Sequence, residues 1–192
     1  MKQQTFNLIQ TIMYQPASYI HHSFGYPPYD KLTMAEKRIY DQQVMVRFQL
    51  PTALDFDLDD NLPAQLYINY WSRLPIAALY SGGLYQLPQL MIANQLKQLP
   101  EPFRQFLSWA RLLLPPQKQQ IVPLIATSYS PEELTKYGMW AMLPLIEKCS
   151  LALTARFSLL FNKNYPQCQA NTVLPVNYSL LKATLNYVTY TT

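Results

Sequence analysis

The chain has 192 residues, of which 49% are hydrophobic and 14% are charged, and its formal net charge at pH 7 is +4. This length suits one domain with ample material for a core, and the charged fraction lies well below the roughly 25% of an average soluble domain. The basic residues are scattered, with no run longer than Lys37-Arg38, so we expect no nucleic-acid partner, because nucleic-acid-binding proteins gather Lys and Arg along the phosphates.

Prolines punctuate the whole chain, which has 16 of them against only 4 glycines. Proline is excluded from helix interiors but is favoured at the first helical position. Alternation of the kind found in strands is confined to residues 44–48 and 187–190. The pattern predicts an all-α fold: a compact single domain over residues 1–192, made of many short helices that stop and restart at prolines.

In chain order, the first clear helix start is Thr33 with Glu36, the sequence signature of a capping box. The helix that follows is predicted to bury an apolar stripe that consists of Leu32, Ala35, Ile39 and Val46. Another apolar ladder begins around Pro63 and consists of Leu62, Leu66, Tyr70 and Leu74. The glycine pair Gly82-Gly83 comes next, and we predict that it caps the C-terminus of a helix.

The clearest amphipathic segment follows Pro102, and its apolar residues are Phe103, Phe106, Leu107, Ala110, Leu113 and Leu114. The strongest helix start is Ser130 before Pro131, with Glu133 in place to complete a capping box. That helix is predicted to bury Leu134, Tyr137 and Ala141, and to end or bend near Pro144. A last ladder near the C-terminus consists of Tyr178, Leu181, Leu185 and Val188.

The residue types that carry catalysis or bind metals are sparse. The only histidines, His21 and His22, lie at a predicted turn, where a packed or surface pair is favoured over a proton shuttle. No zinc-type spacing and no glycine-rich phosphate loop occurs. The tryptophans fall on predicted helical faces and are expected in the core; they are Trp71, Trp109 and Trp140. We therefore expect no catalytic residue, no cofactor and no metal.

An acidic run over residues 55–60 allows three interpretations. It imitates the opening of a calcium loop, but Asp60 and Leu66 stand where that loop needs Gly and a bidentate Glu. It precedes the Pro63 helix, whose positive end it would stabilise as a solvated cap. It also alternates with apolar residues, which is typical of a docking segment. The candidate partner-binding carboxylates are Asp55, Asp57, Asp59 and Asp60.

Three segments resemble the SctK family, also called OrgA or MxiK, of type III secretion accessory proteins. Residues 16–21 (Pro-Ala-Ser-Tyr-Ile-His) are similar to an Asp-Pro-x-Ser-Tyr-Ile-His element, with Gln15 in place of the Asp. Residues 71–75 resemble a Trp-x-x-Leu-Pro helix junction, and residues 153–161 a Leu-x-x-Arg-Phe-x-Leu-Leu-Phe pattern. The motif residues expected to be structural are Pro16, Ser18, Tyr19, Ile20, Trp71, Leu74, Pro75, Arg156 and Phe157.

The resemblance implies an adaptor of the sorting platform, the cytosolic complex beneath the secretion apparatus. Such proteins lie between the cytoplasmic domain of the inner-membrane ring protein SctD and the pod protein SctQ, which leads on to SctL and the ATPase SctN. We expect the same partners here. A contact surface near Tyr19, His21 and His22 is an alternative to the acidic run.

Two other functions stay open at this stage. One is a chaperone or regulator of the same secretion system, although such chaperones are commonly acidic and dimeric, whereas this chain is basic with a pI of about 9.0. The other is a helical enzyme or ligand-binding protein, which would require His21, Cys149 and an acidic residue to converge in a cleft.

The expected location is cytoplasmic, peripheral to the inner membrane. No stretch approaches the roughly 18 apolar residues of a membrane span, and the first residues lack the pattern of a secretory signal. The two cysteines, Cys149 and Cys168, are too few for a disulfide framework, which favours a reducing compartment.

Overall fold

The computed structural model describes residues 3–56, 60–92, 94–113, 130–166 and 176–191. Every regular element within these residues is an α-helix or a short 3-10 helix, which confirms the all-α prediction. The two segments with strand-like alternation, 44–48 and 187–190, fall at the end of one α-helix and inside another. Leu114, Asp57, Asp59 and Cys168 lie outside the described residues.

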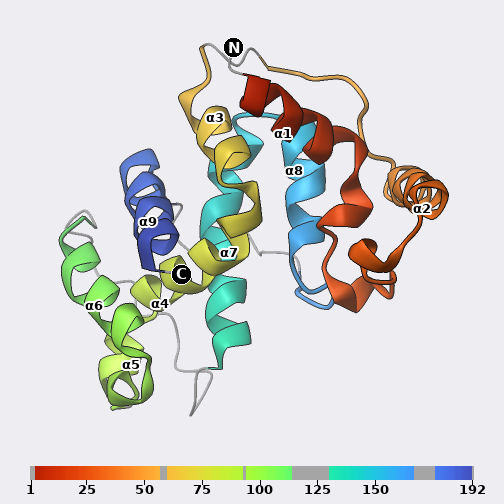
Figure 1. The fold of residues 1–192 in the computed structure, drawn as a ribbon. Helices are drawn as coiled ribbons and strands as arrows, with labels where there is room; N and C mark the ends of the chain where they lie inside the picture. The colour runs from red at the N-terminus through yellow and green to blue at the C-terminus, as the bar shows by residue number, and fades with distance from the viewer. Residues whose placement is uncertain (1–2, 57–59, 93, 114–129, 167–175, 192) are drawn as a thin grey trace. The chain divides into compact units, whose positions relative to one another are not determined.

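The chain forms two compact units, Met1–Ser72 with Ile146–Pro166, and Arg73–Leu145 with Gln167–Thr192. The first unit contains α1 (Gln3–Tyr14), α2 (Met34–Arg47), α3 (Leu62–Asn69) and α8 (Leu151–Phe157) (Figure 1). The second contains α4 (Leu74–Tyr85), α5 (Leu87–Ile92), α6 (Glu101–Ala110), α9 (Tyr178–Thr191) and α7 (Pro131–Glu147) up to Leu145. The 3-10 helices are Pro16–Ser18, His22–Phe24, Tyr29–Lys31, Trp71–Arg73, Leu96–Gln98, Arg111–Leu113 and Ser158–Leu160. That the two units make up a single domain stays a prediction.

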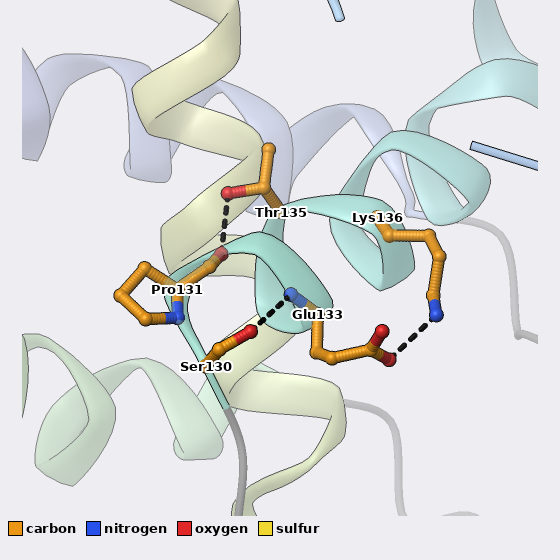
Figure 2. A network of polar contacts seen from close by, with 5 residues as sticks. All are labelled: Ser130, Pro131, Glu133, Thr135 and Lys136. Atoms are coloured by element: carbon orange, nitrogen blue, oxygen red, sulfur yellow. Dashed lines mark hydrogen bonds and ion pairs between the residues drawn. The ribbon is translucent and has the colours of Figure 1, made fainter. Parts of the chain in front are cut away.

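The start of α7 is fixed by side chains of its first turns, as Figure 2 shows. The Ser130 hydroxyl accepts a hydrogen bond from the Glu133 amide at 3.2 Å, which confirms the predicted N-cap. The Glu133 carboxylate pairs with Lys136 at 2.5 Å, one turn further on, and this ion pair takes the place of the return bond of a capping box. The Thr135 hydroxyl donates to the Pro131 carbonyl oxygen at 2.7 Å.

The body of α7 agrees with its predicted buried face, since Leu134, Tyr137 and Ala141 are all buried. The helix does not end near Pro144, because the proline is accommodated inside it and the helix continues to Glu147. The Pro144 ring, which has no amide hydrogen, therefore removes one main-chain hydrogen bond of α7 without ending the helix.

The glycines of the second unit permit close contact between α4 and α7. Gly82 and Gly83 lie inside α4 and do not cap it, so the predicted role was wrong. A Cβ added at Gly82 would lie 1.7 Å from the Leu134 carbonyl oxygen. A Cβ at Gly138 of α7 would lie 1.7 Å from the Ala78 carbonyl oxygen. No side chain fits at either position, so the two backbones pack directly against each other.

The second unit is completed by aromatic side chains of α6 and α9. Of the predicted faces, α6 buries Phe103, Phe106, Leu107 and Ala110, and α9 buries Leu181, Leu185 and Val188, while Tyr178 is half-buried. The Phe106 ring lies 5.2 Å from that of Tyr80. Trp71 and Trp140 are buried, as predicted. Trp109 is 37% exposed and packs edge-on against the Phe106 ring, so the prediction that Trp109 lies in the core was wrong.

In the first unit, α2 begins at the predicted capping box but buries a different face. The Thr33 hydroxyl accepts from the Glu36 amide, and the Glu36 carboxylate accepts from the Thr33 amide at 2.8 Å. Ile39 and Val46 of the predicted stripe are exposed, and the buried residues are Asp41 and Val44. Val44 belongs to a cluster with Ala17, Leu50 and Leu159. The buried side of α2 is therefore the one that carries Val44 and Asp41. The Asp41 carboxylate can be buried there because it accepts hydrogen bonds from within the unit.

We predict that Gly138→Ala lowers the free energy of unfolding by about 1–3 kcal/mol, because overpacking against a backbone carbonyl outweighs the gain of about 1 kcal/mol in helix propensity. Chemical denaturation followed by circular dichroism measures this. Gly25→Ala is the contrast: nothing lies within 4 Å of its added Cβ, but its φ of +81° costs about 1–2 kcal/mol. A Gly138→Ala protein that is more stable than wild type would contradict the direct backbone contact.

Candidate functional site

A buried arginine holds the first unit together. Arg156 of α8 is fully buried, and its guanidinium is satisfied by main-chain carbonyl oxygens. Nε donates to Ile12 at 3.1 Å, Nη1 to Ala152 at 3.0 Å, and Nη2 to Met13 at 2.8 Å and Pro51 at 2.7 Å. Ile12 and Met13 belong to the last turn of α1, whose carbonyl oxygens have no partner within the helix. The cation therefore neutralises the negative end of α1.

The three segments that carry the family resemblance come together around this arginine. Tyr19 donates its hydroxyl proton to the Ile12 carbonyl oxygen at 2.7 Å, and its ring meets the Trp71 ring edge-on with centroids 5.6 Å apart. Burial lowers the pKa of Arg156, and the neighbouring Tyr19 and Tyr14 oppose that shift. Burial also raises the pKa of Tyr19. Tyr19 thus has an internal role, which the sequence alone did not distinguish from a partner contact.

The histidine pair lies at the edge of the same unit. The His21 amide donates to the Leu159 carbonyl oxygen at 2.8 Å, and its ring nitrogen Nδ1 accepts from the Ser23 amide at 3.2 Å. The ring stacks on that of His22, with centroids 4.0 Å apart. Cys149 is buried, and burial raises the pKa of its thiol, which disfavours the nucleophilic thiolate. Nowhere in the described ranges do three His, Cys, Asp or Glu side chains gather as metal ligands would.

Of the acidic run, Asp55 has an internal role that the sequence did not reveal. Its carboxylate accepts from the Ser150 hydroxyl at 2.5 Å and from the first amides of α8, those of Leu151 at 2.5 Å and Ala152 at 3.4 Å. It stabilises α8, whereas α3 is capped by the Asn61 side chain. Asp60 is exposed. Contact of these carboxylates with a partner stays a prediction.

In the first unit, a groove lies between the end of α1 and α2. This groove has a volume of about 720 Å³ and is lined by residues that include Tyr14, Tyr29, Met34, Lys37, Asp41 and Val46. Its one buried carboxylate is Asp41, which accepts from the Ala17 amide and the Tyr29 hydroxyl, both at 2.9 Å. Burial raises the pKa of Asp41 against these hydrogen bonds, and burial with the Asp41 contact raises the pKa of Tyr29 to about 12. Because the buried carboxylate in this groove already has its hydrogen-bond donors, the groove suits docking of a partner side chain.

The comparison with protein families decides what this chain is similar to. The family described as "Bacterial type III secretion apparatus protein (OrgA_MxiK)" matches residues 9–190. The chain belongs to this family. Neither the curated proteins nor the solved structures gave a match. None of the helices in the described ranges of this OrgA_MxiK protein is long and apolar enough to cross a membrane.

We predict that Arg156→Lys lowers the free energy of unfolding by about 3 kcal/mol. An ammonium group cannot reproduce the planar fork of donors, and it leaves buried carbonyl oxygens of α1 without a partner. Denaturant titration measures the effect. Arg38→Lys, at an exposed position of the same unit, is the matched control and is expected to change stability by less than about 0.5 kcal/mol. Equal stability of the two variants would show that the Arg156 guanidinium is dispensable.

A second prediction concerns Asp55. Burial raises the pKa of its carboxyl, but the hydrogen bonds from Ser150 and the α8 amides outweigh this, and the net shift is downward. The ionised form therefore stabilises the fold above the ordinary pKa of about 3.9, and this contribution is lost as the pH falls through the folded-state value.

Asp55→Ala is accordingly expected to lower stability by about 1 kcal/mol at pH 7, with a gap to wild type that narrows below about pH 4. Denaturation at a series of pH values measures the gap. The control is Asp60→Ala, which removes an exposed carboxylate of the same run and is expected to stay within about 0.5 kcal/mol at every pH. A gap for Asp55→Ala that does not depend on pH would argue against the charged cap.

Proposed function

We propose that the chain is a cytosolic sorting-platform adaptor of a type III secretion system, which links the SctD cytoplasmic domain to the pod protein SctQ. Through SctQ it is connected indirectly to SctL and the ATPase SctN, and it is needed for secretion. The observation that carries the proposal is the family match over residues 9–190. The meeting of Tyr19, Trp71 and Arg156, one from each resembling segment, adds support because it gives the shared residues a common structural purpose.

The role is mechanical and involves no catalysis. Among the described groups that could act as acid, base or nucleophile, Asp41 and Asp55 accept internal hydrogen bonds, and Cys149 is buried. Catalytic groups need access to a substrate, and binding adaptors need only a stable body with accessible surfaces. Binding to the ring protein would hold the adaptor peripheral to the inner membrane.

The direct test is reconstitution from purified components. The full chain, SctQ and the SctD cytoplasmic domain from one secretion system are mixed pairwise and together, and the masses are measured by light scattering after size exclusion. We expect a complex with each partner and one that holds all three. A chain that binds neither protein would contradict the adaptor, and a stable homodimer bound to a secreted substrate would favour a chaperone.

The histidines separate the adaptor from an enzyme. We predict that a protein with both His21→Ala and His22→Ala supports secretion at the wild-type level, since the two rings pack against each other and His21 Nδ1 is engaged by the Ser23 amide and hydroxyl in a local turn. Secretion by a deletion strain complemented with this variant measures the effect. Full loss of secretion by a variant that folds and still assembles the pods would reopen the enzyme hypothesis.

A further inference from the structure

Helix α2 carries a second apolar stripe on the side opposite its buried face. Ala35, Ile39, Gln42 and Val46 recur at helical spacing and are all exposed, with Val46 70% and Ile39 55% accessible. The buried side of the same helix already packs Val44 into the core. The second stripe therefore adds nothing to the packing of its own unit. Figure 1 draws this helix almost end-on.

The stripe stands as a ridge between two grooves. Gln42 and Val46 line both of them: the groove of about 720 Å³ towards α1 and another of about 630 Å³ towards Tyr26 and Arg47. A ridge flanked by grooves is the surface on which a second helix packs, because its own side chains enter the grooves.

The charges beside the ridge are unbalanced. Of the two carboxylates of α2, Asp41 is buried and accepts from Ala17 and Tyr29, and the exposed Glu36 accepts from Thr33 in the capping box. The guanidinium groups of Arg38 and Arg47 are exposed, and neither pairs with a carboxylate in the part of the chain that the structure describes. Arg47 packs over the rings of Tyr26 and Phe48, and its Nη1 donates to the Tyr26 hydroxyl at 3.5 Å. The ridge thus has on each flank a positive charge that forms no ion pair with the described residues.

We propose that the α2 ridge, residues 35, 39, 42 and 46, binds an amphipathic helix of a partner protein whose apolar stripe is flanked by Asp or Glu. This deepens the proposed function, on which it rests, by naming the kind of segment that the adaptor holds. The partner's apolar side chains fill the grooves beside Val46, and its carboxylates pair with Arg38 and Arg47.

Two other occupants fit the observations less well. A symmetric contact with a second copy would bring the positive flanks of the two ridges together without supplying a carboxylate for Arg38 or Arg47, and like charges repel. A membrane-surface helix needs large apolar side chains such as Trp, Phe and Leu along its stripe, and here the stripe holds Ala, Ile, Gln and Val. Side-chain grooves on both sides are a feature of helix packing and serve no purpose on a lipid surface.

Site-specific crosslinking tests the inference in cells that assemble the secretion apparatus. A photoreactive benzoylphenylalanine replaces Val46 in the full chain, or, as the matched control, Leu112, which is 78% exposed in the second unit. We expect position 46, and not 112, to crosslink to one protein, within a peptide that has an apolar helical stripe flanked by acidic residues. Crosslinks from 46 only to lipid, only to a second copy, to a segment without acidic flanks, or to nothing would overturn the inference.

The affinity of the full chain and its variants for the crosslinked partner is then measured with the purified proteins. Arg38→Glu with Arg47→Glu, and separately Val46→Glu, are each expected to weaken binding about tenfold or more, with Leu112→Glu unchanged. Wild-type affinity of both α2 variants would likewise overturn the inference. The two proposals can fail separately. If SctQ and SctD bind but position 46 does not crosslink, the adaptor stands without the ridge. If the crosslinked acidic helix belongs to a protein outside the apparatus, the ridge stands without the adaptor.

Discussion

The first unit depends on a buried cation that has main-chain carbonyl oxygens as its main partners. Arg156 joins the end of α1, the segment at Pro51 and α8, which come from distant parts of the chain. Removing a charge from water costs several kcal/mol, and only a full set of acceptors in the right geometry offsets that cost. The guanidinium has five donors in a plane, so it can reach three segments at once, and no other side chain could substitute.

This arrangement separates stability from binding. Arg156, Tyr19 and Asp55 make hydrogen bonds within the unit, and these contacts fix its shape. The α2 ridge consists of exposed residues that the core does not bury. Substitutions in the first group should therefore act through folding, and those on the ridge through association.

The sequence predicted the features that depend on neighbours along the chain. Capping at Thr33 and Ser130, and the buried face of α6, follow from residues within one or two turns. The buried face of α2 could not be predicted in this way, because the helix is apolar on two sides and residues over 100 positions away cover one of them. The prediction for Gly82 was wrong for the same reason, because α7, far along the chain, decides its role, and the bonds of Asp55 to α8 could not be read from its neighbours in sequence.

Hydrogen exchange of the full chain, alone and mixed with the proposed partners SctQ and the SctD cytoplasmic domain, tests most directly whether the first unit binds a partner through α2. We predict that amides of residues 34–47 exchange more slowly in the complex, while those of residues 151–157 exchange equally slowly in both states because the buried arginine already holds that helix. Unchanged exchange over 34–47, with new protection confined to other helices, would contradict it.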